Sequence, residues 1–307
     1  MVFFNNIEFP LILIIGISFS ALRKIVCWGT VNYMTLSERN TFFKAGIVFC
    51  AVCTLFILAA SFFIYNGAGY SLIDGIEEEI RRPYSFFLAS NYYAVHTSIA
   101  VSVFFSLFSI IFILAFFERT SAPEILYIAM FTIAFAFEAI RLFLPLNFIL
   151  NYPSFYVRIA SKILLFIRYF GIFSLFAASL CAAGLEVQKT RNIIFIIIIA
   201  ALVITMGVPI DVLNWDTSLN MVNGYSSLFK MIELIAFFTT MISFLIAAKV
   251  RGSAEYKYIA IGVLFAVAGR GILLSTDNWI GPLPGIVLLS VGTWFICSKL
   301  HKIHLWL

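Results

Sequence analysis

Long apolar runs, separated by short polar breaks, cover this chain almost from end to end. A helix needs about 20 apolar residues to cross roughly 30 Å of hydrocarbon, and most of these runs reach that length. Backbone groups in lipid need partners within the protein, and runs this long and uniformly apolar favour helices over barrel strands. The pattern predicts spans near residues 9–27, 45–65, 94–117, 124–145, 159–183, 193–213, 227–248, 258–277 and 282–298.

The predicted fold is an all-α, polytopic transmembrane bundle in which residues 1–307 form one integral membrane domain. The first run is short, and it lacks the basic segment and small-residue cleavage site of a signal peptide. It is either a span or an interfacial helix, so the bundle has nine or eight spans. The composition agrees with this class, since 63% of the residues are hydrophobic and 11% are charged, with mean hydropathy +1.05.

Basic residues in the connecting loops predict the orientation of the bundle. One set of alternate loops, together with the C-terminal tail, carries twelve lysines and arginines, whereas the other set carries three, Arg81, Arg82 and Arg158. Cytoplasmic loops are enriched in Lys and Arg, so the C-terminus is predicted in the cytoplasm and the N-terminus outside. The net charge of +5 is then explained by topology, and no nucleic-acid partner is expected. We expect a bacterial inner, or cell, membrane location with the lipid bilayer as the surroundings.

The longest connection, residues 66–93, falls on the outer side in this topology. Leu72, Ile73, Ile76 and Ile80 recur there at helical spacing, which predicts a short amphipathic helix lying on the outer surface. This helix is either a lid over the bundle or a solvated connector.

Charged residues interrupt the fourth, fifth, seventh and eighth predicted spans, and Asp211 and Asp277 lie at the outer ends of the sixth and eighth. A charge near the bilayer centre costs roughly 2.5 to 3.5 kcal/mol on insertion scales, so such residues normally face a bundle interior or a wet cavity. All fall in the outer half or, like Arg270, near the midplane, with none deep in the inner half. This asymmetry predicts a polar cavity, open to the outer side and lined by spans four to eight. The interrupting residues are Glu138, Arg141, Lys162, Arg168, Lys230, Glu233 and Arg270.

Two interpretations of these charges remain open. Glu138 and Arg141 are three residues apart, as are Lys230 and Glu233, so each pair could neutralise itself and join neighbouring helices. Lys162 and Lys230 could also extend to the interface. Arg168 and Arg270, in contrast, have no acid within four residues on their own helices. Their expected partners are Glu138, Asp211 or Asp277, or an anionic ligand.

Small residues and a proline accompany two of these charges. Gly262 and Ala266 share a helix face with Arg270, and small residues at such positions admit a neighbouring backbone or a ligand. Pro209 precedes Asp211 by two residues, and its missing N–H predicts a kink in the sixth span beside the acid.

Enzyme and metal motifs are poorly represented. Glu77, Glu78 and Arg82 spell Glu-Glu-x-x-x-Arg, which resembles the first motif of the CAAX-protease-like membrane peptidases. That family also needs metal-ligating histidines in later spans, whereas the histidines here are His96, His301 and His304. Cys50-x-x-Cys53 lies in a predicted span without other metal ligands nearby. We therefore expect no metal and no cofactor, and we lean against enzymatic activity.

The favoured function is a sensor, ligand-binding or interaction-type membrane protein that takes a small anionic or lipid-like ligand from the outer side. Its architecture is similar to the membrane halves of bacterial multi-span signalling proteins, and a separate signalling partner would be required. A secondary transporter of a similar solute and a membrane enzyme acting on a lipid-linked substrate are the alternatives. The candidate ligand-binding residues are Arg168 and Arg270 as anchors, with Asp211, Glu138, Arg141 and Glu233 shaping the site.

Overall fold

A computed structural model of the chain describes residues 35–66, 90–120, 122–150, 153–184 and 190–305. Seven helical segments in this part of the chain are long and apolar enough to cross a membrane. The predicted span at 9–27 and the amphipathic helix predicted around 72–80 lie outside the described residues. The seven segments are α2 (Leu36–Asn66), α4 (Tyr92–Phe117), the composite Glu124–Asn147, α7 (Ser154–Ala183), α9 (Ser226–Val250), α10 (Glu255–Ser275) and α11 (Pro282–Leu305).

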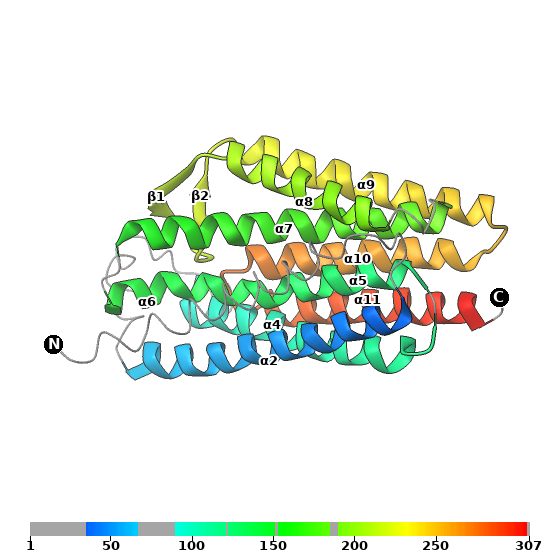
Figure 1. Cartoon of the computed structure of the whole chain (residues 1–307). Helices are drawn as coiled ribbons and strands as arrows, with labels where there is room; N and C mark the ends of the chain where they lie inside the picture. The colour runs from blue at the N-terminus through cyan, green and yellow to red at the C-terminus, as the bar shows by residue number, and fades with distance from the viewer. Residues whose placement is uncertain (1–34, 67–89, 121, 151–152, 185–189, 306–307) are drawn as a thin grey trace.

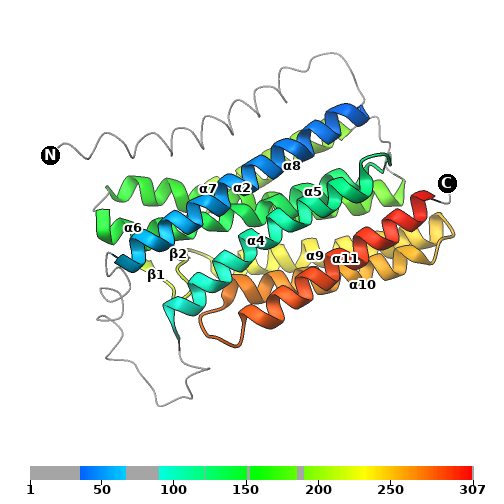
Figure 2. The same cartoon turned by 90° about the horizontal axis from the view of Figure 1, so that it is seen from below.

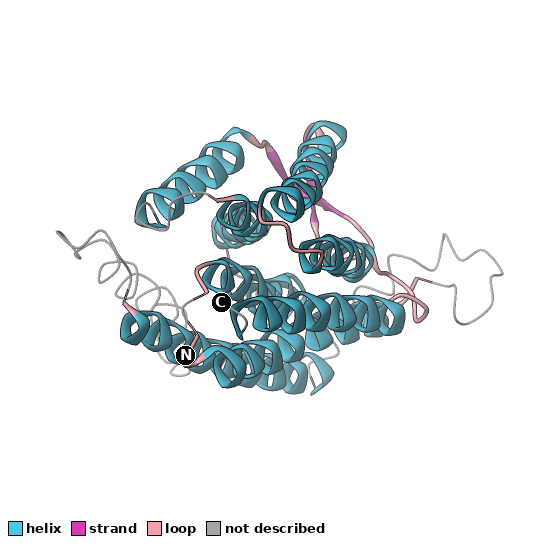
Figure 3. Ribbon diagram, turned by 90° about the vertical axis from the view of Figure 1, so that its right-hand side faces the viewer, coloured by secondary structure: helices cyan, strands magenta, loops and turns pink. Residues whose placement is uncertain are grey.

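The helices lie side by side in one elongated bundle, as Figures 1 and 2 show. We call its left end in Figure 1 the hairpin end, because a two-stranded hairpin and the 276–281 connection lie there. The opposite end, with the 251–254 connection and the C-terminal turn of α11, is the basic end. Seen along the bundle from the basic end, the hairpin lies at the far end of the helices (Figure 3). The helical bundle agrees with the predicted class, whereas the count of nine or eight spans and the orientation stay predictions.

The sixth predicted span, 193–213, is wrong at its outer end. Helix α8 (Thr190–Gly207) stops at Gly207, and its 18 residues measure about 27 Å. Lys162 closes this helix end, because its Nζ donates to the carbonyl of Thr205 at 2.7 Å and to that of Val208. Pro209 follows, and it terminates the helix instead of kinking it; its own carbonyl accepts from the Gly224 N–H at 2.9 Å.

A β-hairpin occupies the residues that hydropathy assigned to the end of this span. Strand β1 (Ile210–Trp215) pairs antiparallel with β2 (Met221–Asn223), with Ile210 opposite Asn223 and Trp215 opposite Met221. The turn, residues 216–220, is closed by the Asp216 N–H donating to the Asn220 carbonyl at 2.8 Å. We call these five residues the hairpin tip. Ser218 and Leu219 of the tip are buried, so it inserts into the protein.

The fourth predicted span, 124–145, is a composite rather than one regular α-helix. It consists of α5 (Glu124–Ala134), a 3₁₀ segment η2 (Phe135–Leu142) and α6 (Phe143–Leu150). Side chains three residues apart are eclipsed in a 3₁₀ helix, and runs of this length are uncommon. The eclipsed spacing places Glu138 and Arg141 on one face of η2, where Nη1 of Arg141 lies 3.7 Å from the Glu138 carboxylate.

Glycines bring α10 and α11 into close contact. A Cβ added to Gly269 would lie 2.5 Å from the Leu289 nitrogen and 2.6 Å from the Gly285 carbonyl oxygen. Gly262 likewise faces the backbone of Gly292. Of the two roles predicted for the small residues near Arg270, Gly262 and Gly269 therefore admit a neighbouring backbone. Gly271 differs, because no heavy atom lies within 4 Å of its added Cβ.

Candidate functional site

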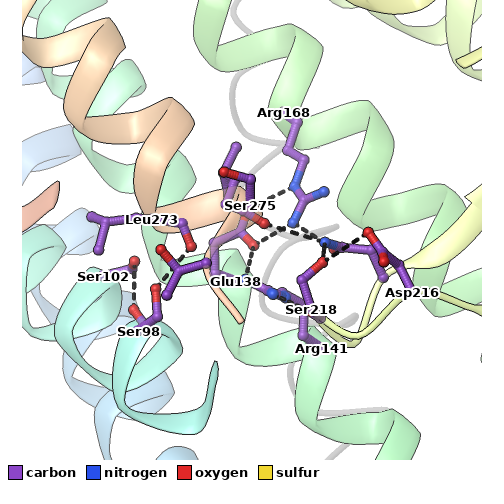
Figure 4. Close-up of polar contacts among 12 residues, drawn as sticks. Ser98, Ser102, Glu138, Arg141, Arg168, Asp216, Ser218, Leu273 and Ser275 are labelled. Carbon is purple, nitrogen blue, oxygen red and sulfur yellow. Dashed lines mark hydrogen bonds and ion pairs between the residues drawn. The ribbon is translucent and has the colours of Figure 1, made fainter. Parts of the chain in front are cut away.

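Glu138 is the centre of a buried charged cluster near the hairpin end. Its carboxylate accepts from Nε of Arg168 at 2.8 Å and from Nη2 of the same residue at 2.6 Å. This is a two-pronged arginine–carboxylate pair, among the strongest polar contacts in proteins. Nη1 of Arg141 lies 3.7 Å from the same carboxylate. Figure 4 shows both arginines converging on Glu138, so one buried acid serves two cations.

The hairpin tip completes this cluster. Nη2 of Arg168 donates to Oδ1 of Asn220 at 2.9 Å, and Arg141 donates to the carbonyl of Ser218. The Asn220 amide in turn donates to Ser218 Oγ at 2.8 Å and to the Leu274 carbonyl at 3.3 Å. Both arginines are thus bound to the tip as well as to Glu138. Sequence reasoning missed Ser218 and Asn220, since neutral polar residues in a loop carry no hydropathy signal.

The tip is also connected to the α10–α11 connection. Thr217 Oγ1 donates to a carboxylate oxygen of Asp277 at 3.2 Å and lies 3.3 Å from that of Asp216. The Asp277 carbonyl accepts from the Asn91 N–H at 2.7 Å, at the start of α4. Asp277, expected as a partner for an arginine, contacts the hairpin tip. Asp277 therefore connects the hairpin tip, through Thr217, with both the α10–α11 connection and the start of α4.

Arg270 lies beside this cluster but has different partners. Its Nη2 is 3.5 Å from Oε1 of Glu233 on α9 and 3.4 Å from the backbone carbonyl of Arg168. Glu233 was not among the partners expected for it. Arg270 is also five residues, or about 8 Å, from the end of α10 at Ser275, and the membrane depth predicted for it stays a prediction.

A cavity of about 160 Å³ opens beside Arg270, between α7, α9 and α10. Lys230, Glu233, Thr240 and Arg270 are its polar wall, and the remainder is apolar apart from the bare backbone of Gly271. A second space of about 10 Å³ is lined by Glu138, Arg168 and Arg270 among others, and this is room for about one water molecule. Sequence reasoning placed a cavity among spans four to eight. The structure has one among the fifth, seventh and eighth.

Asp211 is the remaining predicted site residue. It belongs to β1 instead of ending a helix, and its side chain is outside the described part of the structure. Its role in the site stays a prediction. Glu138, Arg141 and Arg168 are brought together directly, and Arg270 with Glu233 adjoins them through the Arg168 carbonyl.

A buried acid that the sequence did not single out lies at the basic end. Glu124 is fully buried at the start of α5, with Arg251 at 3.8 Å and His304 at 3.7 Å. Arg251 also donates to the Cys181 carbonyl at 3.0 Å and to the Tyr256 hydroxyl at 3.1 Å. The sequence suggested only a topological role for Arg251, but this side chain also ties three helices together. Glu124 was missed because it lies at the edge of a predicted span.

Metal-binding groups are not assembled in the described residues, where no cluster of three or more His, Cys, Asp or Glu side chains is found. The four described cysteines are free thiols, and Cys50 lies 3.2 Å from the Ser106 hydroxyl. The site described above combines guanidinium and ammonium groups, which bind anions, with the carboxylates of Glu138 and Glu233.

Asn220→Ala should release the hairpin tip. The substitution leaves a buried Arg168 donor without its acceptor, so we expect faster deuterium uptake in residues 216–223 and a loss of about 1–3 kcal/mol in stability. Thr239→Ala is the control, because Thr239 is exposed on α9 and bonds only within its own helix. Equal uptake in both variants would show that the tip does not depend on the arginines.

Comparison with known proteins adds a relative of unknown function. An uncharacterised protein of Treponema pallidum (strain Nichols) is 21% identical over 244 residues, which cover 64% of this chain and 71% of that protein. No family model and no solved structure matches the chain. At this identity and coverage, the chain is similar to that protein without being assigned to a family.

Proposed function

We propose that this protein is a multi-pass membrane sensor or binding protein that takes a small anionic or lipid-like ligand into the cavity beside Arg270. The observation that carries the proposal is the composition of the cavity wall. Arg270 and Lys230 face the same space as a single carboxylate, Glu233, which leaves an excess of one positive charge. A separate signalling partner would then read the bound state.

The polar contacts of Arg270 are longer than those of Arg168 in the neighbouring cluster. Arg168 makes hydrogen bonds of 2.6, 2.8 and 2.9 Å, whereas the two polar contacts of Arg270 are 3.4 and 3.5 Å long. Good N–H···O bonds are about 2.9 Å long, and a guanidinium has five N–H donors. Arg270 thus retains donor capacity toward the cavity. Arg168 and Arg141, assigned to ligand binding from the sequence, instead hold the hairpin tip against Glu138 in this proposal.

An outward-facing hairpin end is part of the proposal, because it follows from the distribution of basic loop residues. We expect Ser226→Cys, at the exposed start of α9, to react with a membrane-impermeant maleimide added outside intact cells. Lys257→Cys, exposed at the other end of the bundle, should react only after the cells are opened. Both are made in a chain whose native cysteines are replaced. The reverse pattern would invert the topology.

The function itself is tested by ligand-dependent stabilisation of the purified full-length chain in a neutral detergent. The probes are inorganic phosphate and dodecyl phosphate, with dodecanol as the uncharged control. We expect at least one of the anions to raise the unfolding temperature. In Arg270→Gln its affinity should fall at least about tenfold, because a charge-assisted contact is lost.

Lys257→Gln is the matched control, since it removes an exposed positive charge from the same helix outside the cavity. It should bind the anion as the unaltered chain does. Absence of stabilisation by either anion, or equal loss in both variants, would overturn the proposed function.

A further inference from the structure

We infer that the ligand of this cavity is an anionic amphiphile, a phosphate or carboxylate group carried on an acyl chain, which enters sideways from the lipid leaflet at the hairpin end. This inference rests on the proposed function, and it assigns both the chemical class of the ligand and its route.

The mouth of the cavity lies on the flank of the bundle. Lys230, Leu234 and Gly271 line the cavity and are also exposed, whereas Arg270 at the back is 7% exposed. Helix α9 forms one side of the mouth. Only 22% of its most apolar stretch is buried inside the protein. The exposed flank of an apolar helix in a membrane faces lipid. The cavity is thus continuous with the acyl region of the bilayer.

The charged residues that line the cavity lie at the height along the bundle where lipid headgroups would be. Helix α9 has 25 residues and measures about 37 Å, which exceeds a hydrocarbon core of about 30 Å by a few ångströms at each end. Lys230 is four residues, or about 6 Å, from the start of α9, and Gly271 is equally far from the end of α10. Both therefore lie close to the boundary between headgroups and hydrocarbon.

The cavity wall is polar near the hairpin end and mainly apolar farther into the bundle, just as a lipid is polar at its headgroup and apolar along its chain. Lys230, Glu233 and Arg270 form its part nearest the hairpin end. Phe237, Val267 and Leu175 line its deeper part together with Thr240, whose hydroxyl donates to the Ala236 carbonyl of its own helix. An amphiphile bound with its anion at Arg270 and its chain pointing to the bilayer centre matches this polarity. A soluble anion would leave the apolar half of the cavity unfilled.

The volume supports partial enclosure of such a ligand. Sites that enclose a whole small molecule measure about 300–1,000 Å³, so a cavity of about 160 Å³ holds only part of an amphiphile. The anionic group and the first part of the chain fit that space, and the rest of the chain then remains in contact with the exposed side of α9. Lateral access makes this arrangement possible, because the chain never has to leave the bilayer.

The inference is tested with the full-length chain reconstituted in phosphatidylcholine vesicles that contain spin-labelled lipids. Electron paramagnetic resonance measures the motionally restricted fraction of labelled phosphatidylglycerol and of labelled phosphatidylcholine. We expect about tenfold preference for phosphatidylglycerol at a saturable site, the ratio that one charge-assisted contact supports. The preference should be lost in Arg270→Gln, reduced in Lys230→Gln and retained in Lys257→Gln.

A second variant distinguishes loss of the lipid site from misfolding of Arg270→Gln. Gly271→Leu fills the open mouth while keeping every charge, and its Cβ meets no heavy atom within 4 Å, so it should fold and yet lose the restricted lipid. Displacement of the labelled lipid by inorganic phosphate, or phosphate binding without any lipid preference, would overturn the inference and leave the proposed function standing. Failure of both the lipid and phosphate to bind would overturn both.

Discussion

Glu138→Gln is expected to be the most damaging substitution in the charged cluster, with a loss of about 3–5 kcal/mol in the free energy of unfolding. Glu138 is 3% exposed and is the carboxylate shared by Arg168 and Arg141. Glutamine keeps the shape but removes the negative charge, so the buried guanidinium of Arg141 and the partly buried one of Arg168 lose their compensation. The remaining acceptors around them, the Ser218 carbonyl and the Asn220 amide, are neutral.

The measurement is unfolding of the purified chain in mixed micelles of a neutral and a denaturing detergent. Glu255→Gln provides the control, because Glu255 pairs with Lys299 and Lys302 at the partly exposed basic end, where an ion pair contributes about 0–1 kcal/mol. The double variant with Arg168→Gln should recover part of the loss, since it removes an unpaired cation. If Glu138→Gln costs no more than the control, the cluster is not buried and coupled as described.

Gly269→Ala should be the second most destabilising of these substitutions, although it adds only one methyl group. The new Cβ would stand 2.5 Å from a backbone nitrogen and 2.6 Å from a carbonyl oxygen of α11. Backbone atoms cannot rotate away as a side chain does, so α10 and α11 must separate along their contact. Overpacking of this kind costs about 1–3 kcal/mol.

Gly271→Ala is the matched comparison, since it makes the same change two residues later on the same helix. Its Cβ meets nothing within 4 Å, and alanine favours helix over glycine, so stability should be unchanged or slightly higher. Thermal unfolding of the two variants in the same detergent checks the difference. Similar values for the two would mean that α10 and α11 do not pack through their backbones.

The hydrophobic pattern was sufficient to predict most of the helices. Continuous apolar runs near the length of a span have few other stable structures in lipid, so six predicted spans coincide with the helices α2, α4, α7, α9, α10 and α11. Helix α2 nevertheless starts nine residues before its predicted span, and α11 ends seven residues after its own. The pattern failed at residues 208–213, where an apolar run continues past the end of α8 into β1. Hydropathy cannot separate a strand from a helix over so few residues, and Pro209, from which a kink was predicted, instead follows the end of the helix.

The sequence by itself determined that the chain forms long apolar helices, of a length that suits a membrane span, and that ionisable residues interrupt several of them, because the cost of a charge in hydrocarbon makes each one conspicuous. It did not determine their partners, which depend on contacts between residues distant in the chain. Only the tertiary structure decided that Arg168 binds Glu138 on η2, that Arg270 faces Glu233 on α9, and that Asn220 inserts from a hairpin. A helix face constrains neighbours three or four residues away, whereas these contacts are set by how the helices pack.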